Sequence, residues 1–152
     1  MVKIIDGNLL ESGADIICHQ VNCQGKMASG VAAQISTRYP NVYNSYNWWC
    51  KMYEPADLLG QVQFVAINEK ILIANMFSQD QYGYDGKQYT SIQAFKSCLI
   101  KIHDKAFSNH LRIAMPYKIG CVRGGANWDE VYAIIEEVFK DYEVELCRLD
   151  KG

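Results

Sequence analysis

The sequence predicts one α/β domain, a three-layer α/β/α sandwich built on a mixed six-stranded sheet with helices on both faces. Six short runs rich in apolar and β-branched residues are interspersed with stretches of helical periodicity. Two of these runs are joined by only three polar residues, "NEK" (68–70), which predicts an antiparallel hairpin in an otherwise parallel sheet. No internal repeat, linker or low-complexity segment divides the chain, so we expect residues 1–152 to form a single domain.

The first third of the chain predicts two strands followed by two helices. "VKII" (2–5) is a short apolar run ended by the turn signal "DGN". "ADIICHQV" (14–21) starts apolar on both faces, as expected of a strand covered on both sides. Pro40 should end the first helix and begin the second. The helical stripes are Ala28, Val31, Ala32, Ile35 and Tyr39, and then Val42, Tyr46, Trp49 and Tyr53.

The remainder predicts four strands and two helices. "QVQFVAI" (61–67) and "ILIANMF" (71–77) form the hairpin, and a polar loop rich in glycine and tyrosine follows. Thr90 or Ser91 can cap the next helix, and "LRIAM" (111–115) and "YEVELCRL" (142–149) are the last strands. Between them, Asn127 and Glu130 have the spacing of a capping box. The inward faces of these helices are Ile92, Phe95, Leu99, Ile102 and Ala106, and then Trp128, Val131, Ile135, Val138 and Phe139.

Composition and charge exclude several classes of protein. With 49% hydrophobic and 21% charged residues the chain can form a conventional core, and its net charge of −2 argues against direct non-specific binding to nucleic acid. It contains no apolar run long enough to span a membrane, and its first residues lack signal-peptide architecture, so we expect a cytoplasmic protein without a membrane partner. None of the six cysteines forms a C-x-x-C pair, so we expect neither disulfides nor a metal site. The sequence does not indicate an oligomeric state.

Two glycine-bearing loops stand where chemistry is expected. "NCQGKMASG" (22–30) and "KIGCVRGGAN" (118–127) each follow a predicted buried strand and lead into a helix. Ligands of open α/β sheets bind beyond the carboxyl ends of the strands, where glycines and helix N-termini present N–H groups to an anion. Two such loops facing each other would suit a pyrophosphate. Neither matches a P-loop or a G-x-G-x-x-G pattern, and either loop taken alone could be a simple tight turn.

The residues of these loops carry a family resemblance. "CHQVNCQGKMASGVAAQISTRYP" (18–40) and "MPYKIGCVRGGANWDEVYAIIEEVF" (115–139) resemble the two ligand loops of macro domains, the ADP-ribose-binding α/β/α modules. The predicted element order is also similar, so the resemblance spans nearly the whole chain. With "LLGQV" (58–62), the chain is most similar to the yeast ADP-ribose 1″-phosphate phosphatase group and to the terminal ADP-ribose protein glycohydrolase group.

The resemblance implies a ligand, ADP-ribose or an ADP-ribosylated substrate, and a role for each matching residue. Asn8 and Leu9 stand where the family holds adenine, although many members have aspartate in place of Asn8. Asn22 stands where the distal ribose is contacted, and His19 matches a histidine of the phosphatase group. No cofactor or metal is implied. The phosphate loops correspond to Gly25, Ala28, Ser29, Gly30 and Val31, and to Gly120, Cys121, Val122, Arg123, Gly124 and Gly125.

Several side chains have an ordinary structural alternative. His19 could be a general acid or base, or a strand histidine that bonds to its neighbours. Cys121 could have a lowered thiol pKa, but a small packing residue is the simpler interpretation. Arg123 could bind a phosphate or lie in solvent. Tyr82 and Tyr84 could cover the distal ribose or merely a helix.

The other two histidines, His103 and His110, should be exposed and carry no function.

The chain also departs from one branch of the family. In the protein glycohydrolase group a lysine after the fourth strand and an aspartate in the second loop perform the chemistry. Here "FSQD" (77–80) and "VRGG" (122–125) stand there, with Gly124 near the aspartate position and Asp80 the only nearby carboxylate.

Three hypotheses follow from these matches and departures. The chain hydrolyses a terminal bond at the distal ribose, most simply the 1″-phosphate, with His19 and Asn22 as the catalytic residues. Alternatively, it is a non-catalytic reader of ADP-ribose, or it removes ADP-ribose from protein or nucleic acid with other residues.

Overall fold

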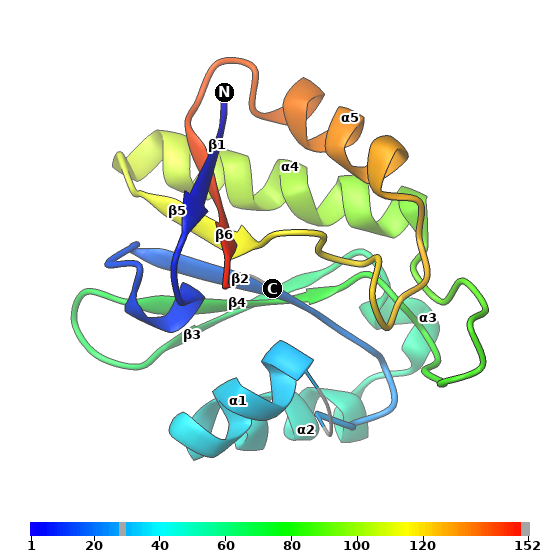
Figure 1. Cartoon of the computed structure of the whole chain (residues 1–152). Helices are drawn as coiled ribbons and strands as arrows, with labels where there is room; N and C mark the ends of the chain where they lie inside the picture. Colours follow the sequence, from blue (N-terminus) through cyan, green and yellow to red (C-terminus); the bar gives the residue numbers. More distant parts are fainter. Residues whose placement is uncertain (28–29, 150–152) are drawn as a thin grey trace.

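A mixed six-stranded sheet lies at the centre of the computed structural model, which describes residues 1–27 and 30–149 (Figure 1). The strand order is β1-β6-β5-β2-β4-β3. All neighbouring strands run parallel except the edge strand β3, which runs antiparallel to β4. The predicted hairpin and mixed sheet are therefore confirmed. The strands are β1 Val2–Asp6, β2 Ile16–Val21, β3 Val62–Ala66, β4 Leu72–Phe77, β5 Ile113–Pro116 and β6 Val144–Arg148.

Helices cover both faces of the sheet, which confirms the three-layer α/β/α sandwich. In Figure 1, α4 and α5 lie on one face, and α1 and α2 lie on the other. Within residues 1–27 and 30–149, no helix combines the length and apolarity needed to cross a bilayer. The helices are α1 Gly30–Arg38, α2 Pro40–Met52, α3 Pro55–Leu58, α4 Ile92–Asn109 and α5 Trp128–Val138, with a 3₁₀ turn, η1, at Leu9–Glu11.

Strand β2 shows why its sequence is apolar on both faces. Ile16 and Cys18 belong to the core under α4 and α5, whereas Ile17 and Val21 belong to the core under α1 and α2. Successive side chains of a strand point to opposite faces, so a strand buried by helices on both sides needs apolar residues at nearly every position. The exceptions on β2 are His19 and Gln20, which lie toward its carboxyl end.

The helix boundaries follow the local signals. Ser91 caps α4 by accepting a hydrogen bond from the backbone N–H of Ala94, and Asn127 caps α5 in the same way. Pro40 is the first residue of α2, as predicted. Tyr53 does not extend the buried stripe of α2, because the helix ends at Met52 and the tyrosine is half exposed. The short elements α3 and η1 were not predicted, since neither is long enough to display a period.

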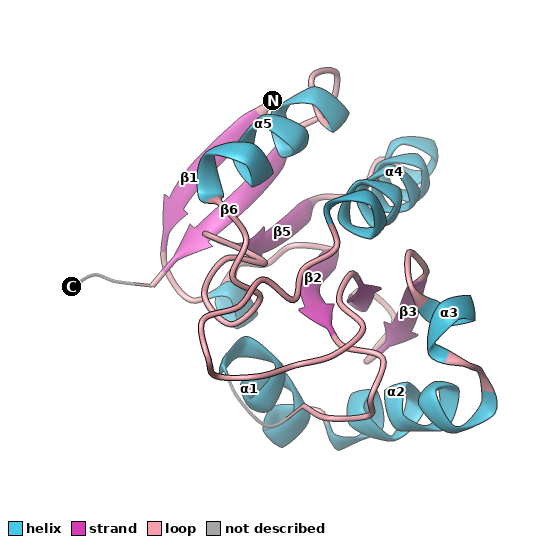
Figure 2. Cartoon of the chain, turned by 90° about the vertical axis from the view of Figure 1, so that its right-hand side faces the viewer, coloured by secondary structure: helices cyan, strands magenta, loops and turns pink. Residues whose placement is uncertain are grey.

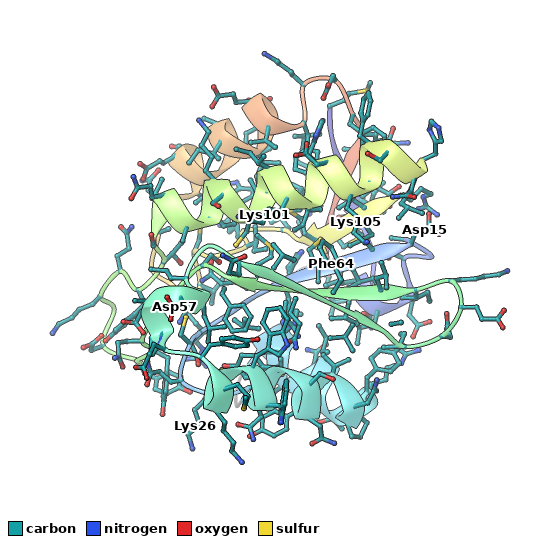
Figure 3. All side chains as sticks on the ribbon, turned by 180° about the vertical axis from the view of Figure 1, so that it is seen from behind. Asp15, Lys26, Asp57, Phe64, Lys101 and Lys105 are labelled. Carbon is teal, nitrogen blue, oxygen red and sulfur yellow. The ribbon has the colours of Figure 1, made fainter. Side chains whose placement is uncertain are left out.

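Side chains of α4 contact the edge strand β3. The ammonium group of Lys105 lies 5.0 Å from the centre of the Phe64 ring on β3 (Figure 3). One helical turn earlier, Lys101 donates a hydrogen bond of 3.0 Å to the carbonyl of Gly60, just before β3. Lysines beside an edge strand also discourage pairing with another chain.

His103 is a correction to the sequence analysis, which expected it to be exposed. Its side chain retains only 17% exposure, because the aromatic rings of Phe107, Phe139 and Tyr142 surround it. Its Nε2 lies 2.7 Å from a carboxylate oxygen of Asp141, in the segment after α5. His110, which follows α4, is exposed as expected.

Candidate functional site

Three loops meet at one end of the sheet because the strands before them are neighbours. The strands β5, β2 and β4 lie side by side and run parallel, so the segments that follow them leave from the same edge. Within the described residues, these segments are 117–127, 22–27 and 78–91. Figure 2 faces this edge and shows the loops crossing between α1 on one side and α4 and α5 on the other.

The loops enclose a cleft of about 360 Å³. Its wall includes three cationic residues, Lys26, Lys118 and Arg123, and none of the described residues that line it is acidic. This local positive charge contrasts with the net charge of −2 of the whole chain. Such a cleft suits an anionic ligand.

Asn22 organises the first loop from inside. Its side-chain oxygen accepts a hydrogen bond of 2.9 Å from the Gln24 N–H, and its side-chain nitrogen donates to the carbonyl of Lys26 at 2.9 Å. Tyr46 of α2 lies with its hydroxyl 2.8 Å from both the backbone and the side-chain oxygens of Asn22. Asn22 lines the cleft, but most of its amide already bonds within the protein. A contact to the distal ribose therefore remains a proposal.

The other residues predicted for the first loop divide into three groups. Gly30 and Val31, at the start of α1, line the cleft. Gly25 is buried behind it, where its N–H donates to the Tyr46 hydroxyl. Ala28 and Ser29 lie outside the described residues.

The second loop packs tightly against the segment that follows β4. The carbonyl of Gly124 accepts hydrogen bonds from the N–H groups of Tyr89 and Thr90, at 2.6 and 3.0 Å. A Cβ at position 124 would collide with the Thr90 hydroxyl and with the carbonyl of Gly120, so only glycine fits. The cleft is lined by Gly120, Val122, Arg123 and Gly124, whereas Cys121 and Gly125 are not among the lining residues.

A network of polar side chains supports the second loop, and sequence analysis missed it. Gln20 Nε2 donates to Gln79 Oε1 at 2.5 Å and to Thr90 Oγ1 at 2.8 Å. Ser78 Oγ donates to Gln20 Oε1 at 2.7 Å, and Thr90 Oγ1 donates to the carbonyl of Gly120 at 2.8 Å. The available signal was a glutamine inside a buried strand, which needs polar partners.

Residues 80–89 form a rim over the cleft. An isolated bridge between Gln79 and Thr90 closes the base of this segment, and Tyr82 and Tyr84 line the cleft. The guanidinium of Arg123 lies 4.7 Å from the centre of the Tyr84 ring, a cation–π contact between the second loop and the rim. Asp80 ties the rim to the first loop, because its carboxylate accepts a hydrogen bond of 2.9 Å from Gln24.

His19 lies in the wall of the cleft but retains only 1% exposure. Its Nε2 is 2.5 Å from the side-chain oxygen of Asn75 on β4. Burial lowers the pKa of His19 to about 4, although the hydrogen bond to Asn75 works in the opposite direction. The imidazole is therefore neutral at pH 7.

Cys121 does not have the properties of a reactive thiol. Partial burial raises its pKa, and the charge of Lys118 offsets this only in part. All six cysteines are free thiols, and among residues 1–27 and 30–149 no group of three or more His, Cys, Asp and Glu side chains could hold a metal ion. The packing interpretation of Cys121 is therefore the better supported one.

Known proteins with similar sequences are named for reactions of ADP-ribose derivatives. No protein-family profile matches the chain. It is 24% identical to an ADP-ribose 1″-phosphate phosphatase of Saccharomyces cerevisiae, in an alignment that covers 97% of this chain and 98% of that relative. It is 26% identical to a DNA ADP-ribosyl glycohydrolase of Thermus aquaticus over 94% of this chain, but spans only 39% of that relative.

A comparison with a solved structure identifies the fold. The macrodomain of Thermus aquaticus DarG superposes with a TM-score of 0.79 at 23% identity, covering 97% of this chain and 98% of that one. This chain has the macro-domain fold. The resemblance seen in the sequence and the predicted architecture are thereby confirmed together.

The residues expected to hold adenine, Asn8 and Leu9, lie beyond the end of β1. Asn8 caps η1 by accepting a hydrogen bond of 2.9 Å from the Leu10 N–H, and Leu9 is buried in the core under α1 and α2. Neither residue lines the cleft described above. Their contact with adenine remains a proposal.

Proposed function

We propose that this macro domain binds ADP-ribose and its derivatives in the cleft and hydrolyses a terminal group at the distal ribose, most simply the 1″-phosphate. The observation that carries the proposal is the meeting of two glycine-bearing loops, from the adjacent strands β2 and β5, on one cationic cleft. Backbone N–H groups of these loops and the N-terminus of α1 would bind the diphosphate. The match to the yeast phosphatase along nearly the full length of both chains supports it.

The chemistry would depend on positioning and on charge stabilisation. Water would attack the phosphorus atom, the bond from phosphorus to the ribose oxygen would break, and inorganic phosphate and ADP-ribose would leave. Arg123 of the second loop would stabilise the negative charge of the terminal phosphate. Asn22 would orient the distal ribose, and neutral His19 would accept a hydrogen bond from the water or the ribose.

A second candidate is removal of ADP-ribose from DNA. The Thermus aquaticus relative named for this activity matches 94% of this chain, and the cations of the cleft would suit a nucleic-acid phosphate. The chain must use other residues than the protein glycohydrolase group, since Ser78 and Gln79 follow β4 where that group has lysine. The chain lacks both the lysine and the second-loop aspartate of that group, which supports the alternative that it binds ADP-ribose without catalysis.

One set of assays separates these functions. Calorimetry with ADP-ribose tests binding, and three substrates test turnover: ADP-ribose 1″-phosphate, an ADP-ribosylated DNA oligonucleotide and an ADP-ribosylated protein. We expect binding together with phosphate release from the first substrate. Binding without turnover on any of the three would identify a reader, and absence of binding would disprove the proposal.

Two variants test the roles of the site residues. His19→Ala should abolish turnover while ADP-ribose still binds, though more weakly, and an unchanged rate would remove His19 from the mechanism. Arg123→Ala should weaken binding of ADP-ribose 1″-phosphate about tenfold, the loss of one charge-assisted hydrogen bond to its terminal phosphate. Lys140→Ala, which removes an exposed cation after α5, is the matched control.

A further inference from the structure

A row of buried polar side chains crosses three neighbouring strands beside the cleft. His19 on β2 is in register with Asn75 on β4, which is in register with Gln63 on β3. Asn75 Nδ2 donates to Gln63 Oε1 at 3.0 Å, and Gln63 Nε2 donates to the backbone carbonyl of Ser45 in α2 at 3.0 Å. The exposed fractions of His19, Asn75 and Gln63 are 1%, 0% and 5%.

The far end of this row fixes the direction of every hydrogen bond in it. The carbonyl of Ser45 can only accept, so Gln63 must turn its NH₂ group toward it and its oxygen toward Asn75. Asn75 must then use its NH₂ group to donate to Gln63, which leaves its oxygen facing His19. An oxygen can only accept at that position, so Nε2 of His19 must carry a hydrogen.

The other ring nitrogen is left as an acceptor. A neutral imidazole with its hydrogen on Nε2 has a lone pair on Nδ1. In His19 this Nδ1 is buried and has no hydrogen-bond partner among the residues that the structure describes. A buried acceptor without a donor is unfavourable, and a ligand hydroxyl would supply the missing donor.

We propose that Asn75 and Gln63 are positioning residues that hold His19 in the Nε2–H tautomer, so that Nδ1 accepts a hydrogen bond from a ribose hydroxyl of the bound ligand. The identity of the ligand rests on the proposed function, whereas the tautomer is a property of the free protein. The arrangement assigns His19 the role of an acceptor. It excludes the alternative in which His19 protonates a leaving group as a general acid.

Nitrogen NMR of the unaltered protein tests the tautomer directly. The chain has only three histidines, so long-range ¹H–¹⁵N spectra of histidine-labelled protein are simple, and His103→Gln and His110→Gln assign them. At pH 7, without ligand, we expect His19 to show a protonated Nε2 and an unprotonated Nδ1. The opposite tautomer, or an equal mixture of both, would overturn the proposal.

Variants of Gln63 and Asn75 test the positioning role. Gln63→Leu keeps the contact between His19 and Asn75 but releases the orientation of the Asn75 amide, so a second tautomer should appear and ADP-ribose affinity should fall about tenfold. Asn75→Asp can only accept at that position, so Nε2 of His19 should stay protonated. Gln93→Leu, at an exposed position of α4, is the control. A single unchanged tautomer in both Gln63→Leu and Asn75→Leu would disprove the positioning role.

Titration with ADP-ribose distinguishes failure of this inference from failure of the proposed function. We expect binding to shift the Nδ1 resonance of His19 as it gains a hydrogen bond. Saturating ADP-ribose that leaves this resonance unchanged would overturn the acceptor role. If ADP-ribose does not bind, the proposed function fails, and the tautomer of the free protein then decides the present inference by itself.

Discussion

Tyr46 joins the hydrophobic core to the first loop. Its ring stacks on Phe77 at 5.7 Å between centres, while its hydroxyl contacts Asn22 and accepts a hydrogen bond from the Gly25 N–H. The sequence predicted only the packing, since Tyr46 stands in the apolar stripe of a helix. The hydroxyl makes this tyrosine a support of the cleft wall.

Replacement of that hydroxyl should therefore affect stability and binding together. Tyr46→Phe keeps the ring but leaves the buried N–H of Gly25 without an acceptor, which should cost about 1–3 kcal/mol. We also expect weaker ADP-ribose binding by calorimetry, because the first loop loses its anchor. Tyr43→Phe, whose hydroxyl is 3.3 Å from the Gly25 carbonyl, is the matched control and should have the smaller effect. Equal effects in urea unfolding would contradict this account.

Position 124 requires glycine because its neighbours leave no room for a side chain. A methyl group there would collide with the Thr90 hydroxyl and the Gly120 carbonyl, so Gly124→Ala must move the second loop away from the segment after β4. We expect a loss of about 2–3 kcal/mol in the free energy of unfolding and at least tenfold weaker ADP-ribose binding.

The control is a glycine with open space around it. Gly86→Ala meets no neighbour within 4 Å and costs only the strain of a φ of +81°, about 1–2 kcal/mol. Its effect on ADP-ribose affinity should be small. A binding defect as large as that of Gly124→Ala would show that the collision is not the cause.

At the level of the elements, the caps connect local sequence to the position of the site. Asn127 ends the second loop and caps α5 by accepting a hydrogen bond of 3.1 Å from the Glu130 N–H. Asn127→Ala should lower the free energy of unfolding by about 1 kcal/mol, measured by urea denaturation. Asn127→Asp keeps the acceptor and favours the helix dipole, so it should restore most of the loss. Equal destabilisation by both changes would rule out the capping role.

The long elements could be predicted because their signals are local. The stripe of α4, the cap of α5 and the hairpin are each visible within a short window, and each is confirmed, although the connection between β3 and β4 is residues 67–71 and not only 68–70. The helix α3 could not be predicted, since its four residues show no period. The predicted exposure of His103 was wrong for a different reason, because its partner Asp141 lies 38 residues further along the chain.

On the scale of the whole molecule, two histidines make stability depend on pH in opposite directions. Burial alone would lower the pKa of His103, but its hydrogen bonds to Asp141 and Asp104 outweigh this effect and raise it above 6.5. The stabilisation from His103 is therefore complete below pH 6.5 and is lost as the pH rises through the folded pKa. Burial lowers the pKa of His19 to about 4. Between pH 6.5 and pH 4 the unfolded chain therefore takes up a proton that the folded protein does not, and the free energy of unfolding falls as the pH falls.

We therefore expect the free energy of unfolding to be greatest near pH 6.5 and to fall on both sides. His103→Gln should flatten the alkaline side, because it removes the link between α4 and the segment after α5, and His110→Gln should change nothing. Urea denaturation from pH 4 to pH 9 measures this profile. An alkaline side that is the same in His103→Gln and in the unaltered protein would contradict the assignment.

The site could be predicted from the sequence only in part. Residues of the two glycine-bearing loops, Asn22 among them, do line one cleft together with His19. The sequence did not reveal Lys26 and Lys118 as its cations or Gln20 as the centre of a polar network. It could not, because those roles depend on which strands become neighbours.

The sequence by itself determined the order of the elements, the class of sheet, the helix caps and the two loops, because apolar periodicity, capping residues and glycines act over a few residues. Only the tertiary structure decided which side chains share hydrogen bonds. His19 meets Asn75 across 56 residues, and Gln20 meets Thr90 across 70. These partners are brought together by the order of β5, β2 and β4 in the sheet. Long-range burial sets that order, so no short window of sequence contains it.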